Sequence, residues 1–431
     1  MVNTKEIMEK DAMYLAAVYK KKPIVIVEGS GAVVRDSDGK EYIDCLSGIS
    51  VTNAGHSPER LVKAGSEQLK RLIHCSGLYY SIPQTLLAEK LAGVAPKHLR
   101  KSFFCNSGAE AVEGAVKLAK KYAASQGRSG SGLIALEGSF HGRLGLSLTL
   151  TGQAKYKKGF GNFANYPGIA HAPAPYCYRC PLSYPSCGME CARKVEDIIK
   201  YHTSGDVAAL IAEPIMGEGG IIVPPDGYHT EVQKICRDHN ILYIADEVQT
   251  GFGRCGVMFA HELFKIEPDL MTMAKGIGGG LPIGGVICTD EVAGCLESGD
   301  HFSTFGGNPV CCAVALENIS LLLEEGLVEN SKNLGRKVLS SLMELKEKYS
   351  IIGQARGRGL MIGLELVKDD QRKVPACDET QELAKFMMKH GVIVGTGGVL
   401  GNVIRIQPPL CINQDQATRV LEVIENGIKK L

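Results

Sequence analysis

The chain has 431 residues, of which 45% are hydrophobic and 22% are charged, and its formal net charge is +1. This length exceeds what one hydrophobic core usually serves, so two packed units are expected. The balanced charge argues against nucleic acid or an anionic membrane as a partner, because both require a basic face. No apolar run reaches the ~18 residues of a membrane-spanning helix, and the first residues lack a signal-peptide core. We therefore expect a cytoplasmic protein.

Apolar segments alternate with helical patterns along the chain. The segment 24–45 predicts a hairpin whose turn is D-S-D-G-K. The later strands are expected at 102–105, 132–136, 208–213, 241–246, 270–274 and 283–288. The helices between and after them are expected at 108–124, 227–239, 309–324 and 330–348. Apolar strands separated by helices predict an α/β fold whose central sheet is mainly parallel, with helices on both faces.

The end of the chain predicts a smaller α+β unit. Its strands are expected at 358–367 and 403–407, and its helices near 379–390 and 414–430. We therefore expect a large domain at 56–325 and a small domain at 326–431, with the segment 1–55 packed on the small domain.

The stretch 153–192 is rich in Gly, Pro, Tyr and Cys and predicts a long surface insertion. Fifteen cysteines, an odd number, do not indicate a disulfide scaffold. Four of them follow the pattern C-x2-C-x6-C-x3-C, namely Cys177, Cys180, Cys187 and Cys191. Four thiolates could form a structural zinc or cluster site. The interpretation that we favour is a loop of reduced thiols without a metal.

Two polar residues follow apolar strands. Asp246 ends one strand, and a carboxylate at that edge is costly unless it meets a cation or several donors. Lys275 follows the next strand and precedes a run of glycines. An amine held against apolar surface loses its preference for the charged form, as a nucleophilic lysine requires. The alternatives are a helix-capping acid and a solvated lysine.

A third feature is the turn formed by Ser107, Gly108 and Ala109, between a strand and an Ala-rich helix. Free N–H groups at a helix N-terminus bind an anion such as a phosphate. The turn lacks the Walker pattern, and the glycines after Lys275 lack the dinucleotide spacing. A phosphate turn, an acid and a lysine together predict a site for pyridoxal 5′-phosphate (PLP), whose phosphate, ring nitrogen and aldehyde need those three groups.

The sequence resembles the class III aminotransferases of the 4-aminobutyrate and ornithine type, which are PLP enzymes of fold type I. The resemblance extends from SGISVTNAGHSP to IRIQPPL. It is carried by NSGAEAVEGAVKLA, SFHGR, IAEPIMGEGG, IADEVQTGFGR, MAKGIGGGLPIGG and STFGGNPV. It implies ping-pong transfer of an amino group from an omega-amino acid, an amine or a small amino acid to a 2-oxo acid.

The resemblance implies roles for individual residues. Lys275 would form the Schiff base and move the proton, and Asp246 would pair with the ring nitrogen. Gln249 would lie near the ring hydroxyl, and Glu213 would lie near the cofactor and the lysine. Phe140 would stack on the ring with His141 beside it, and Ser107, Gly108 and Ala109 would hold the phosphate.

Other matches concern the substrate and the partner subunit. Thr304 matches a hydroxyl that reaches the phosphate of the neighbouring subunit, which implies a homodimer, or a tetramer made of two such dimers, with shared active sites. Arg143 and Arg405 match carboxylate-binding arginines, Glu218 matches the acid that pairs with Arg405, and Ile49 matches an apolar wall. A salt bridge at the surface is the alternative for each arginine.

Two other functions remain open. A PLP-dependent racemase or epimerase would use the same lysine with a second base. A non-catalytic, metal-bridged or regulatory protein would instead use the cysteine-rich stretch.

Overall fold

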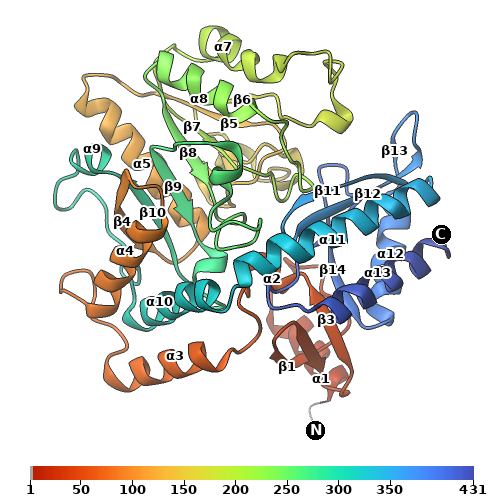
Figure 1. Ribbon diagram of the computed structural model, residues 1–431. Helices are drawn as coiled ribbons and strands as arrows, with labels where there is room; N and C mark the ends of the chain where they lie inside the picture. The colour runs from red at the N-terminus through yellow and green to blue at the C-terminus, as the bar shows by residue number, and fades with distance from the viewer. Residues whose placement is uncertain (1–2) are drawn as a thin grey trace.

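The computed structural model describes residues 3–431. A seven-stranded sheet forms one half of the molecule (Figure 1). In spatial order its strands are β4 (Leu99–Cys105), β10 (Gly284–Thr289), β9 (Leu270–Met273), β8 (Leu242–Asp246), β7 (Val207–Ala212), β5 (Gly132–Leu136) and β6 (Ile169–Ala172). The six strands other than β10 point the same way, which confirms the mainly parallel sheet.

Strand β10 is the exception, because it runs antiparallel to both β4 and β9. Only a short glycine-rich connection, which includes η5 (Lys275–Ile277), separates it from β9. A parallel return requires a crossover of a dozen or more residues, usually a helix, so this short connection brings the chain back antiparallel.

Helices cover both faces of this sheet. Along β5, Leu133 and Ala135 pack in one buried cluster with α5 (Gly108–Ser125), while Ile134 and Leu136 face the opposite cluster. The opposite cluster includes apolar residues of α7 (Glu190–His202), α8 (Tyr228–Asp238) and α10 (Pro309–Glu324). Alternate side chains of one strand thus enter two cores, as expected for a sheet buried on both sides.

A second, eight-stranded sheet joins the two ends of the chain. Its path is β1 (Ile26–Ser30), β2 (Val33–Asp36), β3 (Glu41–Cys45), β14 (Val392–Gly397), β15 (Val403–Ile406), β12 (Met361–Asp369) and β11 (Ile352–Arg358), with β13 (Val374–Pro375) beside β12. Strand β3 pairs in parallel with β14, so the red N-terminal strands of Figure 1 lie against the blue C-terminal region. The domain boundaries at residues 55 and 325 stay predictions.

The remaining helices pack around these sheets. The C-terminal sheet is covered by α11 (Leu327–Lys348) and α12 (Cys377–Lys389), and α13 (Gln414–Ile428) packs on both of these helices. The other elements are α1 (Thr4–Tyr14), α2 (Ser47–Ser50), α3 (Glu59–Arg71), α4 (Ile82–Val94), α6 (Gly145–Leu150) and α9 (Asp290–Ala293), with the short turns η1 (Ala154–Tyr156), η2 (Gly161–Ala164), η3 (Cys177–Arg179) and η4 (Ala260–Phe264). Within residues 3–431, no helix is long and apolar enough to cross a membrane.

The stretch 153–192 is more ordered than the predicted insertion. It contains β6, which pairs in parallel with β5, and it ends in the first residues of α7. Strand β6 is a short edge strand with the sequence IAHA, and it lacks the apolar run that identified the other strands. Part of the predicted surface insertion is therefore an edge strand of the sheet, and for the rest of the stretch the insertion stays a prediction.

Candidate active site

Four neighbouring strands deliver polar side chains to one edge of the seven-stranded sheet. Lys275 follows β9, Asp246 ends β8, Glu213 follows β7, and Phe140 and His141 lie beyond β5. The carboxyl ends of parallel strands share an edge, so these residues meet there. A cavity of about 490 Å³ opens at this edge, and all five residues line it.

Asp246 is the most firmly held of these groups. Its carboxylate is 3% exposed and accepts hydrogen bonds on both oxygens. His141 Nδ1 lies 2.7 Å from Oδ2, and Thr272 Oγ1 donates to Oδ1 over 2.9 Å. The backbone N–H of Val248 also donates to Oδ1, over 3.1 Å. Three partners fix the direction in which this buried carboxylate faces the cavity.

Lys275 brings an amine to the same cavity. Its backbone has a φ of 49°, in the left-handed region that a lysine rarely adopts. Burial lowers the pKa of the Lys275 amine, and the carboxylates of Glu218, Asp246 and Glu213 oppose that shift. A lowered pKa increases the fraction of neutral amine, which is the nucleophilic form.

Glu213 lines the cavity and accepts two backbone hydrogen bonds. Its Oε1 accepts the N–H of Phe140 over 2.9 Å, and its Oε2 accepts the N–H of Gly217 over 2.7 Å. Burial raises the pKa of Glu213 to about 7, and the nearby Asp246 charge acts in the same direction. Glu213 therefore links the loop after β5 to the segment that follows β7.

The N-terminus of α5 closes another side of the cavity. Ser107 caps the helix by accepting the N–H of Glu110 over 3.3 Å, and the cavity wall includes Ser107, Gly108 and Ala109. A Cβ at Gly108 would stand 2.7 Å from Val248 Cγ1, so only glycine fits there without displacement. The first N–H groups of a helix bind anions, so this turn can hold a phosphate.

An aromatic and cationic cluster lies at the mouth of the cavity. The rings of Phe140 and Tyr156 meet edge to face with centroids 5.3 Å apart. The Arg143 guanidinium lies 4.3 Å from the Tyr156 ring centroid and 5.5 Å from that of Phe140. Arg143 is therefore held by ring faces, and both Arg143 and Phe140 line the cavity.

Arg405 and Glu218 form a buried ion pair beside the cavity. Arg405 Nη1 lies 2.9 Å from Glu218 Oε2, and their side chains are 6% and 15% exposed. Neither residue lines the cavity wall, although both charges act on Lys275. Arg405 Nη2 also donates to the carbonyl of Thr396 over 3.4 Å.

The other expected site residues differ in their placement. Gln249 lines the cavity and accepts the amide of Gln407 over 3.0 Å. Ile49 is 37% exposed and does not line the wall, whereas Val51 of the same segment does. Thr304 is exposed and also lies away from the cavity of its own chain.

Sequence reasoning missed several residues of this site. Tyr156 lies in the cysteine-rich stretch 153–192, where no pattern indicated a site residue. Thr272 was missed because its contact with Asp246 depends on the pairing of β8 with β9. Val248 lies between Asp246 and Gln249 in the motif IADEVQTGFGR, so the same motif could have indicated it. The wall also includes Val51, Asn106, Gly142, Val248, Ala274, Gly280, Leu281, Pro282 and Ile283.

The four cysteines of the insertion are free thiols. Burial raises the pKa of Cys177 to about 11, and the other three cysteines act in the same direction. Over residues 3–431, no group of three or more His, Cys, Asp or Glu side chains is arranged to hold a metal ion. The structure therefore adds no support to the metal hypothesis, which metal analysis of the pure protein would test.

Comparisons with known proteins agree with this geometry. The family model "Aminotransferase class-III" matches residues 14–428. The chain is 40% identical over 430 residues to an acetylornithine aminotransferase of Methanothermobacter thermautotrophicus, with 100% of both proteins covered. It is 39% identical over 410 residues to a leucine/methionine racemase of Thermococcus litoralis, covering 94% of this chain and 90% of that protein.

A solved structure gives the same result. An (S)-enantioselective omega-transaminase from Thermomicrobium roseum matches with a TM-score of 0.94 and 34% identity, covering 100% of this chain and 99% of that one. The cofactor of this family is PLP, and a lysine, a buried carboxylate and a helix N-terminus on one cavity fit its aldehyde, ring nitrogen and phosphate. The chain belongs to the class III aminotransferases and is a PLP-dependent transaminase of fold type I.

Proposed function

We propose that the enzyme moves an amino group from an omega-amino acid, an amine or a small amino acid to a 2-oxo acid, using Lys275 as the lysine that holds PLP. The supporting observation is the convergence of Lys275, Asp246 and the α5 N-terminus on one cavity. Amino donors tested against pyruvate, glyoxylate and 2-oxoglutarate would identify the substrates. Absence of amino transfer with every pair would contradict the proposal.

The proposed roles follow from the contacts of each residue. When bound, PLP supplies an electron sink for the carbon that carries the amino group. Lys275 holds the cofactor and then moves a proton at that carbon, which its lowered pKa favours. Asp246 holds a proton on the ring nitrogen, with its direction fixed by His141 and Thr272. Gln249 would approach the ring hydroxyl.

The remaining cofactor contacts come from two elements. Ser107, Gly108 and Ala109 would bind the phosphate through the α5 N-terminus. Phe140 would lie on the ring, with its backbone held by Glu213. Glu213 thereby positions the aromatic wall.

Substrate carboxylates would bind to the two arginines. Arg405 is buried and paired with Glu218, so it stays neutralised when a donor without a carboxylate at that position binds. A 2-oxo acid would replace Glu218 and form two parallel hydrogen bonds with the guanidinium. Arg143, held on two rings at the cavity mouth, would contact a more distant carboxylate, and Ile49 would form an apolar wall.

Racemisation is the second candidate, favoured by the similarity to a leucine/methionine racemase. It requires a second base facing the reacting carbon. The three carboxylates that act on Lys275 are each engaged: Glu213 by two N–H groups, Asp246 by three donors and Glu218 by Arg405. These contacts favour transamination. If chiral chromatography showed that the enzyme converts L-leucine to D-leucine without any 2-oxo acid, the result would favour the racemase.

A homodimer with shared active sites is the proposed assembly. Large apolar side chains are exposed next to Thr304 and at residues 78–82, which directly follow Gly77, where a Cβ would lie 3.6 Å from Phe302. An apolar surface of this kind typically marks a contact with another protein. The exposed side chains are Leu78, Tyr79, Tyr80, Ile82, Phe302 and Phe305. We expect a mass of twice 46.3 kDa by light scattering, and a single-chain mass would contradict the dimer. The near-neutral charge supports a cytoplasmic enzyme without nucleic acid or membrane partners.

A further inference from the structure

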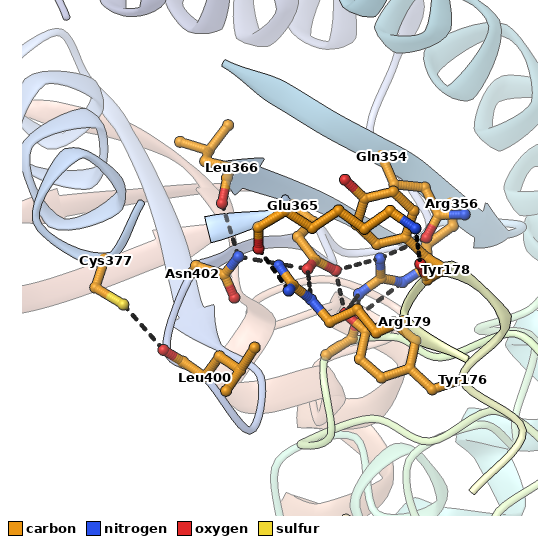
Figure 2. A network of polar contacts seen from close by, with 12 residues as sticks. Tyr176, Tyr178, Arg179, Gln354, Arg356, Glu365, Leu366, Cys377, Leu400 and Asn402 are labelled. Carbon is orange, nitrogen blue, oxygen red and sulfur yellow. Dashed lines mark hydrogen bonds and ion pairs between the residues drawn. The ribbon is translucent and has the colours of Figure 1, made fainter. Parts of the chain in front are cut away.

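A buried polar network lies in the eight-stranded sheet, around strand β12 (Figure 2). At its centre is Glu365 of β12, which is fully buried. Its Oε2 accepts Arg356 Nη1 over 2.6 Å and also accepts the hydroxyl of Tyr176. Its Oε1 accepts Arg179 Nε over 2.6 Å and the amide of Asn402 over 3.4 Å. One carboxylate thus pairs with two guanidinium groups.

Arg356 connects this network to the segment that carries Glu218. Its Nη2 donates to the carbonyl of Gly220 over 2.6 Å, and its Nε donates to the carbonyl of Ile221 over 3.0 Å. The guanidinium therefore spans Glu365 on one side and two consecutive carbonyls on the other. Its planar shape allows it to make both sets of contacts at once.

Residues 216–222 form a tight loop, which we call the Glu218 loop. A bridge between Met216 and Ile222 closes it, with backbone hydrogen bonds of 3.1 and 2.9 Å. Ile221 has a φ of 55°, and a Cβ at Gly220 would approach Arg356 Nη2 to 3.3 Å. Arg356 therefore holds the backbone of this loop at Gly220 and Ile221, two and three residues after Glu218, which pairs with Arg405.

We propose that Glu365 and Arg356 are positioning residues, which hold the Glu218 loop where its carboxylate pairs with Arg405 and so set the affinity of Arg405 for a substrate carboxylate. The inference rests on the proposed function of the Arg405–Glu218 pair. Without the charge of Glu365, the buried Arg356 loses its ionic partner and no longer anchors the loop carbonyls. Glu218 then competes less well for Arg405.

The test measures the binding of glutarate, an unreactive dicarboxylate, to the holoenzyme by titration calorimetry. Glu218→Gln removes the competing carboxylate and is expected to lower the Kd for glutarate by about tenfold. Glu365→Gln is expected to lower it about three- to tenfold. Arg356→Lys keeps the buried charge but cannot reach both carbonyls, so it should change the Kd in the same direction. The matched control Arg179→Met removes the other arginine on Glu365 and should leave the Kd unchanged.

A double-variant cycle separates positioning from a general loss of structure. If Glu365 acts through Glu218, adding Glu365→Gln to Glu218→Gln changes the Kd no further. Additive effects, or an equal effect of Arg179→Met, would overturn the inference. The inference would also be overturned if Glu365→Gln and Arg356→Lys both kept the wild-type Kd while Glu218→Gln lowered it. No glutarate binding by the wild type, or no effect of Glu218→Gln, would instead refute the proposed role of the Arg405–Glu218 pair.

Discussion

Substitution of Gly108 by alanine tests the phosphate turn directly. A Cβ at this position would stand 2.7 Å from Val248 Cγ1, 3.2 Å from Val248 Cγ2 and 3.6 Å from Ala274 Cβ. The two segments must separate by about 0.7 Å to restore ordinary contact. Either the α5 N-terminus moves away from the phosphate position, or the loop between Asp246 and Gln249 moves.

The expected cost follows from that overlap. Forcing one extra carbon into a packed site typically costs about 1–3 kcal/mol. Since about 1.4 kcal/mol corresponds to a tenfold change in an equilibrium constant, the Kd for PLP should rise about 5- to 140-fold. The enzyme should keep its fold, because the overlap involves a surface-facing helix end and one valine side chain.

The assay is titration of the cofactor-free enzyme with PLP, followed by its visible absorbance. Gly93→Ala is the matched control, because it lies in α4 and its Cβ would meet nothing within 4 Å. Alanine in a helix is more favourable than glycine by about 1 kcal/mol, so this control should bind PLP normally and melt no lower than the wild type. An unchanged Kd for Gly108→Ala would refute the assignment of the phosphate turn.

Lys275→Ala should abolish turnover and weaken PLP binding, and retained turnover in a coupled assay would refute the lysine assignment. Asp246→Asn should lower turnover about 100-fold or more, because the loss of a buried, charge-assisted contact costs about 3 kcal/mol; full activity would contradict the ring-nitrogen role. Arg405→Ala should slow the half-reaction with 2-oxo acids most in single-turnover measurements, and equal losses for every substrate would contradict the proposal that a 2-oxo acid replaces Glu218 on Arg405. Burial raises the pKa of the Glu247 carboxyl from 4.5 to about 7 in the folded state. Between those two pH values the unfolded state has lost the proton while the folded state keeps it, so the free energy of unfolding falls as pH rises from 4.5 to 7. In urea denaturation at pH 5 and pH 8, Glu247→Gln should reduce the loss of unfolding free energy between the two pH values by up to about 3 kcal/mol. An unchanged pH dependence in the variant would contradict the raised pKa of Glu247.

The sequence was sufficient for features that depend on local pattern. Apolar strands followed by Asp246 and Lys275 predicted both the sheet and the residues at its edge, because parallel strands place their carboxyl ends together. The turn at Ser107 was predicted by the strand and Ala-rich helix that flank it. Local signals were strong at these positions, since strands buried on both faces are apolar throughout.

Features that depend on long-range pairing were not accessible in the same way. Strand β6 is a short strand defined only by its partner β5, whereas the antiparallel direction of β10 could have been inferred from the short connection between the strands expected at 270–274 and 283–288. The contact between Thr272 and Asp246 follows from the register of β8 and β9. The Glu365 network includes a hydrogen bond between Tyr176 and Glu365, which lie 189 residues apart, so no local pattern predicts it.

The most direct test of the central assignment is to find the lysine that holds PLP. Borohydride reduction of the holoenzyme makes that bond permanent, and peptide mass spectrometry then locates it. We expect the pyridoxyl group on the peptide that contains Lys275, and none on that peptide in Lys275→Ala. A modified lysine elsewhere in the chain, or an unmodified enzyme, would contradict the account of this cavity.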